Sequence, residues 1–90
     1  MNRERRKQIE EIISKLESLQ GEIELMKDEV QEIADMEQGY LDNMPENLQN
    51  SSNAERSSEA IDNLGYASEE IENVENAIQD AISYLESAKE

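Results

Sequence analysis

The fold of this chain is decided by residues 9–33, which read IEEIISKLESLQGEIELMKDEVQEI. Apolar side chains recur here at intervals of three and four residues, the heptad spacing of a helix that packs against another helix. The stripe consists of Ile9, Ile12, Leu16, Leu19, Ile23, Met26, Val30 and Ile33. It continues to Tyr40 and Met44, and only Glu37 interrupts it. We therefore expect one helix of about forty residues with an apolar side, and we expect Tyr40 to lie in its core.

The second half of the chain carries a matching stripe that alternates large residues with mostly alanine. Its members are Ala60, Leu64, Ala67, Ile71, Val74, Ile78, Ala81, Leu85 and Ala88. Small side chains opposite large ones let two helices come close together. We therefore predict an all-α chain in which two helices form an antiparallel coiled-coil hairpin.

The connection between the helices contains the one proline of the chain, Pro45. Proline cannot continue a helix, and it disfavours the helical conformation in the residue before it. Ser52 and Glu55 form a capping box that starts the second helix, and Asn43 with Glu46 resembles another. We predict a single domain with a helix over 2–41, a loop over 43–52 that includes a short turn around 45–48, and a helix over 53–89. Leu48 is expected to cover the hairpin end.

Two helices alone bury little apolar surface, so we expect the hairpin to associate with a second copy of itself. Apolar residues flank the two predicted stripes near the open end and near the loop: Ile13, Ala34, Met36, Leu41, Ile61, Ile82 and Tyr84. We predict that they form the interface of a homodimer packed as a four-helix bundle. Glu37 predicts either fraying near the loop or a buried polar contact that sets the register.

The composition excludes most catalytic chemistry. The chain has no histidine and no cysteine, so it lacks the usual general base, the usual zinc ligands and a thiol nucleophile. No calcium-loop motif and no glycine-rich phosphate loop is present. We expect a protein that is not an enzyme and binds no metal or cofactor. Without a long apolar run, we also expect no membrane span and no signal peptide, and hence a cytoplasmic location.

The net charge is -15, and it is unevenly distributed. A basic cluster at residues 3–7 is expected to neutralise acids near the C-terminus, whereas residues 8–90 hold 22 acids and four cations, a net of -18. Such a surface repels nucleic acid and attracts basic clefts of other proteins. We predict a partner-binding acidic surface formed by Glu24, Asp28, Glu32, Asp35, Asp62, Glu69 and Glu72. The alternative is that these acids only keep the rod in solution.

The segment around the proline, residues 40–49, reads YLDNMPENLQ. With its two acidic flanking helices, it resembles small acidic proteins encoded by phages and prophages of Gram-positive bacteria. The resemblance implies a phage setting, in which small acidic proteins include inhibitors of host defence such as anti-CRISPR and anti-restriction proteins. The loop could itself contact a partner, through Tyr40, Asp42, Asn43, Glu46 and Asn47.

Two functions follow as hypotheses. In the first, the protein mimics nucleic acid and inhibits a host defence enzyme with a basic surface, for example a CRISPR effector nuclease, in the host cytoplasm. In the second, it is a structural or assembly adaptor that binds partner helices through its coiled-coil faces.

Overall fold

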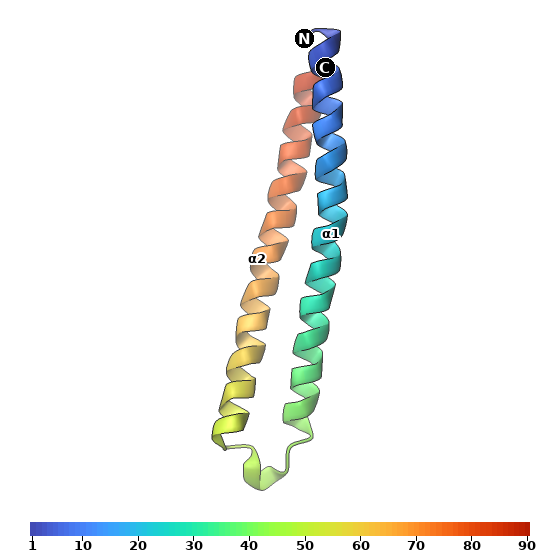
Figure 1. Ribbon diagram of the computed structural model, residues 1–90. Helices are drawn as coiled ribbons and strands as arrows, with labels where there is room; N and C mark the ends of the chain where they lie inside the picture. Colours follow the sequence, from blue (N-terminus) through green and yellow to red (C-terminus); the bar gives the residue numbers. More distant parts are fainter.

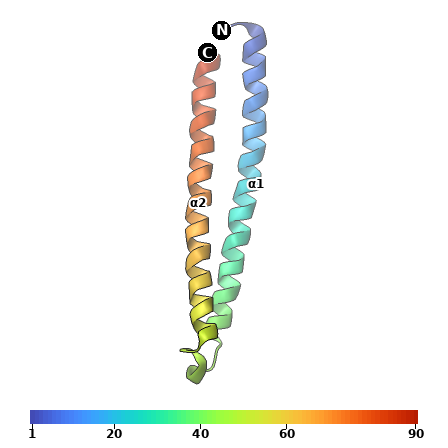
Figure 2. The same cartoon turned by 60° about the vertical axis from the view of Figure 1, so that its left-hand side comes forward.

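The computed structural model describes all 90 residues and shows two long helices that run side by side in opposite directions (Figure 1). Helix α1 spans Arg3–Asp42 and helix α2 spans Ser52–Lys89, with a short 3₁₀ helix, η1, at Glu46–Leu48 between them. Both termini lie at the end opposite the loop (Figure 2). The predicted all-α hairpin is therefore confirmed, and it forms a rod of 70 × 14 × 13 Å.

Side-chain caps fix where the two long helices begin. The Asn2 side chain accepts a hydrogen bond from the Arg5 backbone N–H at 2.8 Å, and the Ser51 hydroxyl accepts one from the Ala54 N–H at 3.3 Å. The cap of α2 is thus Ser51, one residue before the predicted Ser52. Ser51 has extended backbone angles (φ -76°, ψ 166°), as an N-cap requires, whereas Ser52 is already helical.

The connection contains the predicted short turn, which is η1. Pro45 precedes it without a side-chain cap, so the capping role predicted for Asn43 is wrong. Instead, the Asn43 backbone N–H donates to the Gly39 carbonyl at 3.1 Å and closes the last turn of α1. Leu48 is 47% exposed and does not cover the hairpin end.

The interface between the helices follows a strict heptad spacing, but it uses a different pair of positions from the predicted one. On α1, the buried and half-buried side chains toward α2 are Ile9, Ile13, Leu16, Gln20, Ile23, Lys27, Val30, Ala34, Glu37 and Leu41. On α2 they are Ala54, Ser57, Ile61, Leu64, Ser68, Ile71, Glu75, Ile78, Ile82, Leu85 and Lys89. Every second member of each predicted stripe, such as Ile9 and Leu16, therefore lies in the observed interface. The members between them are replaced by the next residue along the chain, for example Ile12 by Ile13.

The displacement has a physical reason. Three heptad series on α1 carry apolar residues, those that begin at Ile9, Ile12 and Ile13, although Gln20 and Lys27 interrupt the third. A single partner helix covers only two of the three series. The observed pairing buries Ile13 and Ala34, and it lets polar side chains such as Gln20 and Lys27 meet partners on α2. Tyr40, expected in the core, is exposed as a consequence.

The core lies in the half of the rod near the termini. Ile13, Ile23, Ile78 and Ile82 are buried together, and Ile9, Leu16, Ile71 and Leu85 pack around them. Only seven residues are buried, and no large side chain is fully enclosed, so the hairpin has a small core. Neither helix offers a stretch that is both long and apolar enough to cross a membrane.

The dimer interface predicted from sequence needs correction at the buried positions. Ile13, Ala34 and Ile82 are buried within the hairpin, where each contributes to its own interior. Leu41 and Ile61 are half-buried between the helices. Of the seven predicted residues, Met36 and Tyr84 remain exposed. The five others face the other helix because they belong to the heptad positions that the observed pairing covers.

Candidate functional site

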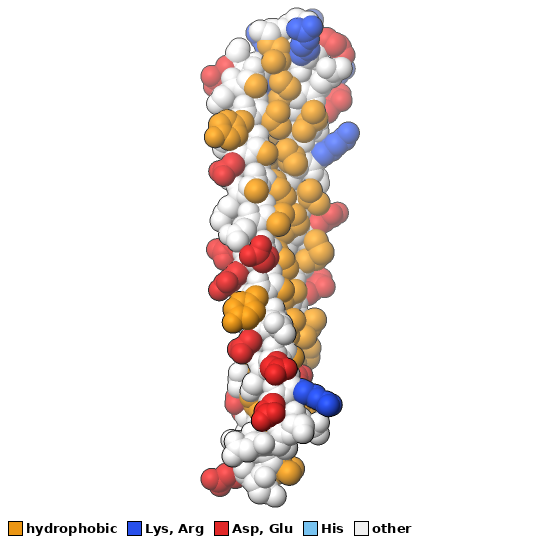
Figure 3. Space-filling view, turned by 90° about the vertical axis from the view of Figure 1, so that its left-hand side faces the viewer, with side chains coloured by type: hydrophobic (Ala, Val, Ile, Leu, Met, Phe, Trp, Pro, Cys, Tyr) orange, Lys and Arg blue, Asp and Glu red, His pale blue; other side chains and the backbone are white.

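The first candidate surface is an apolar face that runs along one side of the rod. On α1 its large side chains are between 42% and 55% exposed. We use the name apolar face for Ile12, Leu19, Met26, Ile33 and Tyr40 of α1 with Ala60, Ala67, Val74, Ala81 and Ala88 of α2. Figure 3 shows hydrophobic side chains gathered into a lengthwise strip, with acidic side chains on both flanks.

Heptad geometry explains why both helices contribute to one face. Ile12 follows the interface residue Ile9 by three positions, and Val74 follows Ile71 by the same spacing. In an antiparallel pair, residues that follow an interface residue by the same number of positions on each helix lie on the same side of the pair. The large residues of α1 therefore lie beside the small residues of α2.

The opposite side of the rod is a polar edge with cross-helix contacts. Gln20 Nε2 donates to Gln79 Oε1 at 3.0 Å, and Lys27 Nζ lies 2.7 Å from Glu75 Oε1. The hydrogen bond to Glu75 raises the pKa of Lys27 above its usual value, partial desolvation opposes this, and the nearby carboxylates support it. These contacts hold the register of the two helices on this side.

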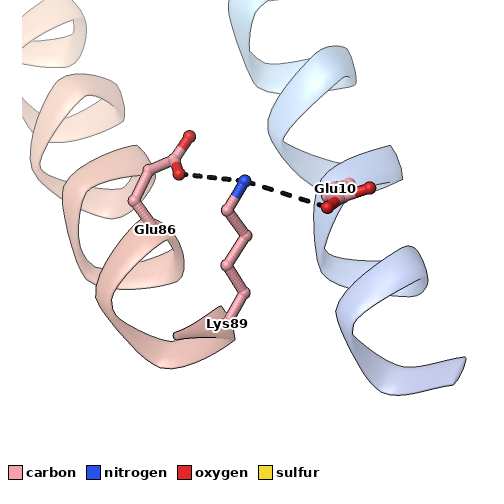
Figure 4. A network of polar contacts seen from close by, with 3 residues as sticks. All are labelled: Glu10, Glu86 and Lys89. Atoms are coloured by element: carbon pink, nitrogen blue, oxygen red, sulfur yellow. Dashed lines mark ion pairs between the residues drawn. The ribbon is translucent and has the colours of Figure 1, made fainter. Parts of the chain in front are cut away.

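At the open end, Lys89 Nζ lies between two carboxylates, 3.1 Å from Glu86 Oε2 and 4.0 Å from Glu10 Oε1 (Figure 4). The hydrogen bond with Glu86 raises the pKa of Lys89, partial desolvation opposes this, and the charge of Glu10 adds to the increase. The basic residues at 3–7 form no ion pair, so Lys89 takes the neutralising role that was expected of them.

The second candidate surface is acidic. All seven residues of the predicted acidic surface are exposed, but they do not form one compact patch. Glu24 and Glu72 flank the polar edge, and their negative charges contribute to the raised pKa of Lys27. The heptad spacing places Asp28 and Asp35 next to them, on the side of α1 that is turned away from α2.

On α2, Asp62 and Glu69 occupy the corresponding outward positions, and Glu32 lies on the side of α1 directly opposite α2. The acidic surface therefore extends from the outer side of α1 across the polar edge to the outer side of α2. Nowhere do three acidic side chains come together in a cluster that could hold a metal ion.

The third candidate surface is a cleft of about 510 Å³ at the loop. It is lined by Tyr40, Asn43, Met44, Pro45, Leu48, Ser51 and Asn53. Two of the predicted loop contacts, Tyr40 and Asn43, line it, whereas Asp42, Glu46 and Asn47 do not. The Asp42 carboxylate accepts a hydrogen bond from Gln38 Nε2 at 2.8 Å, so it supports the end of α1.

The apolar face was missed as a surface at the sequence level, because its residues were assigned to the interior of the hairpin. The signal that could have revealed it is the width of the apolar stripe on α1, which reaches three of seven positions near Ile13 and near Ala34, whereas a two-helix interface needs two. Comparisons with protein-family models, curated proteins and solved structures found no match to this chain.

Proposed function

We propose that this chain is a non-enzymatic binding protein whose acidic surface docks into a basic, nucleic-acid-binding cleft of another protein and competes with its nucleic acid. The resemblance of residues 40–49 supports a phage setting, with a host defence enzyme such as a CRISPR effector nuclease as the target in the host cytoplasm. The protein itself does not bind nucleic acid directly in this proposal, because like charges repel.

The observation that carries the proposal is a long row of carboxylates without cations beside them. The three ion pairs of the protein all involve Lys27 or Lys89, which leaves Asp28, Asp35, Asp62 and Glu69 without a cation within 4 Å. Residues 8–90 carry -18 along a rod of 70 Å, about one charge per 4 Å, against ~1.7 Å per charge in duplex DNA. The rod is thus an extended polyanion of fixed shape.

The experiment isolates a target and then measures competition. Host proteins captured by the immobilised protein at low salt would be tested for binding of a labelled oligonucleotide by fluorescence anisotropy. The hairpin is expected to displace the oligonucleotide, and its affinity is expected to fall at least about tenfold as salt rises from about 0.05 to 0.3 M.

A matched pair of variants tests the position of the charges. Asp28→Lys/Asp35→Lys reverses two outward acids of α1, and Glu22→Lys/Glu29→Lys reverses two exposed acids of the same helix with the same seven-residue spacing on the flank of the apolar face. The first variant is expected to weaken binding by more than tenfold, and the second by less. Binding that is insensitive to salt and unchanged by Asp28→Lys/Asp35→Lys would rule out mimicry.

The exposed apolar face supports a second candidate, the adaptor that packs against helices of another protein. An adaptor would lose its partner on Met26→Glu and keep it on Asp28→Lys/Asp35→Lys, whereas a nucleic-acid mimic would show the reverse pattern. Met26 is suited to this comparison because it is exposed, whereas Ile13, Ile61 and Ile82 face the interior of the hairpin.

A further inference from the structure

The apolar face is a feature of the molecule that the hairpin leaves without a partner. The seven buried residues make a small core for 90 residues, while five large apolar side chains of α1 stay about half exposed along one line. We propose that a second copy of this chain covers the apolar face with its own apolar face, giving a homodimeric four-helix bundle. This interface differs from the one predicted from sequence, and the inference is independent of the proposed function.

The shape of the apolar face fits a copy of itself. On α1 it presents the large residues Ile12, Leu19, Met26, Ile33 and Tyr40 as a ridge, and on α2 it presents four alanines and Val74 as a shallow groove. Both series repeat every seven residues, so ridge and groove have the same axial spacing. In a two-fold symmetric dimer, the ridge of each copy lies in the groove of the other, and both ridges are covered at once.

The charges that border the apolar face permit a second negative copy to approach. The positions next to the face on its outer flanks hold two cations and three acids, a net of -1: Lys15, Arg56, Glu22, Glu29 and Glu70. The polar edge, with its cross-helix ion pairs included, holds six acids and two cations, a net of -4: Glu10, Glu17, Glu24, Glu72, Glu75, Glu86, Lys27 and Lys89. Two of the four cations in residues 8–90 thus lie where a dimer would bring two copies together, and repulsion is weakest there.

The size of the face also suits a dimer. From Ile12 to Tyr40 it extends about 42 Å along the helix axis. With the rod width of 14 Å, the flat projected area is about 600 Å², of the same order as the roughly 800 Å² of accessible surface that each partner buries in a standard interface. Met36 and Tyr84, exposed and adjacent to the face by heptad spacing, would enlarge it, and these are the two predicted interface residues that the hairpin leaves free.

The first test is the mass of the wild-type protein in solution. Sedimentation equilibrium between about 1 µM and 1 mM is expected to give twice the 10.3 kDa of one chain at the upper end, and the melting temperature is expected to rise with protein concentration. A folded 10.3 kDa monomer throughout this range would overturn the proposal and leave the face to a different protein. A trimer or larger assembly would overturn it as well.

The second test locates the interface by substitution of two neighbouring residues. Met26, 48% exposed, lies on the apolar face, and Leu25, 63% exposed, lies outside it. Met26→Glu introduces one charge from each copy into the proposed interface and is expected to raise the dimer dissociation constant at least about 100-fold, whereas Leu25→Glu adds the same charge and should change it by less than tenfold. Equal effects of the two variants, or dissociation by Leu25→Glu alone, would place the interface elsewhere and overturn the proposal.

A substitution that introduces no charge tests the same interface if Met26→Glu does not fold. The protein has no cysteine, so Met26→Cys and Leu25→Cys each supply a single thiol. Modification of the Met26→Cys thiol by a maleimide should slow at least about tenfold between dilute and concentrated protein, because dimerisation excludes the reagent, while Leu25→Cys should react at one rate. Concentration-independent modification of both thiols would contradict the dimer.

Discussion

At the scale of single residues, Glu37 is the position where the sequence left two possibilities, and the structure selects one. The Ser57 hydroxyl of α2 donates a hydrogen bond to Glu37 Oε1 of α1 at 2.6 Å, and Ser57 is only 4% exposed. A carboxylate on an apolar stripe is costly unless it is paired, and this pairing crosses between the helices. Glu37 therefore forms the polar contact that sets the register near the loop, and α1 continues past it to Asp42.

We expect Ser57→Ala to lower the free energy of unfolding by about 1–3 kcal/mol, because it leaves the Glu37 carboxylate without its partner. Each kcal/mol corresponds to ~4–8 °C in melting temperature for a protein of this size, which thermal denaturation followed by circular dichroism resolves. The control is Ser58→Ala, at an exposed neighbour. The double variant Glu37→Leu/Ser57→Ala should recover most of the loss, and equal melting temperatures of Ser57→Ala and Ser58→Ala would show that the contact contributes nothing.

At the scale of elements, the two helices depend on their ends and on each other more than on contacts along their own surfaces. Within α1, the hydrogen bonds from Gln31 to Asp35 and from Gln38 to Asp42 link residues four apart, and neither is an ion pair. In α2 the single ion pair within the helix is that of Lys89 with Glu86. Caps consequently matter, because each fixes where an otherwise weakly supported helix begins.

We expect Ser51→Ala to destabilise the protein by about 1 kcal/mol, since the Ala54 N–H loses its acceptor. The neighbouring substitution Ser52→Ala should change the stability by less than half of this amount, because Ser52 is within the helix and its hydroxyl caps nothing. Urea denaturation of both variants measures the difference. A larger loss for Ser52→Ala would restore the cap position predicted from sequence.

At the scale of the whole molecule, the dominant property is the high density of negative charge on a thin rod. The two helices carry it on every side except the apolar face, so the charges of one hairpin repel each other and those of any second copy. Salt screens this repulsion, and it also weakens attraction to a basic partner. Salt should therefore strengthen the fold and the dimer while it weakens docking into a basic cleft.

We expect the melting temperature to rise by about 5 °C, equivalent to roughly 1 kcal/mol, between about 20 mM and 500 mM NaCl. The control is Asp28→Lys/Asp35→Lys, which changes the net charge from -15 to -11, since each substitution adds two positive charges. Its salt dependence should be smaller. A melting temperature that stays constant or falls with salt would mean that ion pairs outweigh repulsion in this fold.

The sequence by itself determined that the protein is an all-α hairpin. Heptad spacing predicts two helices with apolar stripes of similar length, and Pro45 ends the first helix, so the stripes can be buried when the chain folds back on itself. It also placed the helix ends to within a residue or two and singled out Glu37 as the break in the stripe. Only the tertiary structure decided which two of three apolar positions on α1 meet α2. That choice depends on the partners that Gln20 and Lys27 find on the other helix, which cannot be read from either stripe alone. The same choice moved Ile13, Ala34 and Ile82 into the hairpin and left Met26 and its heptad neighbours exposed.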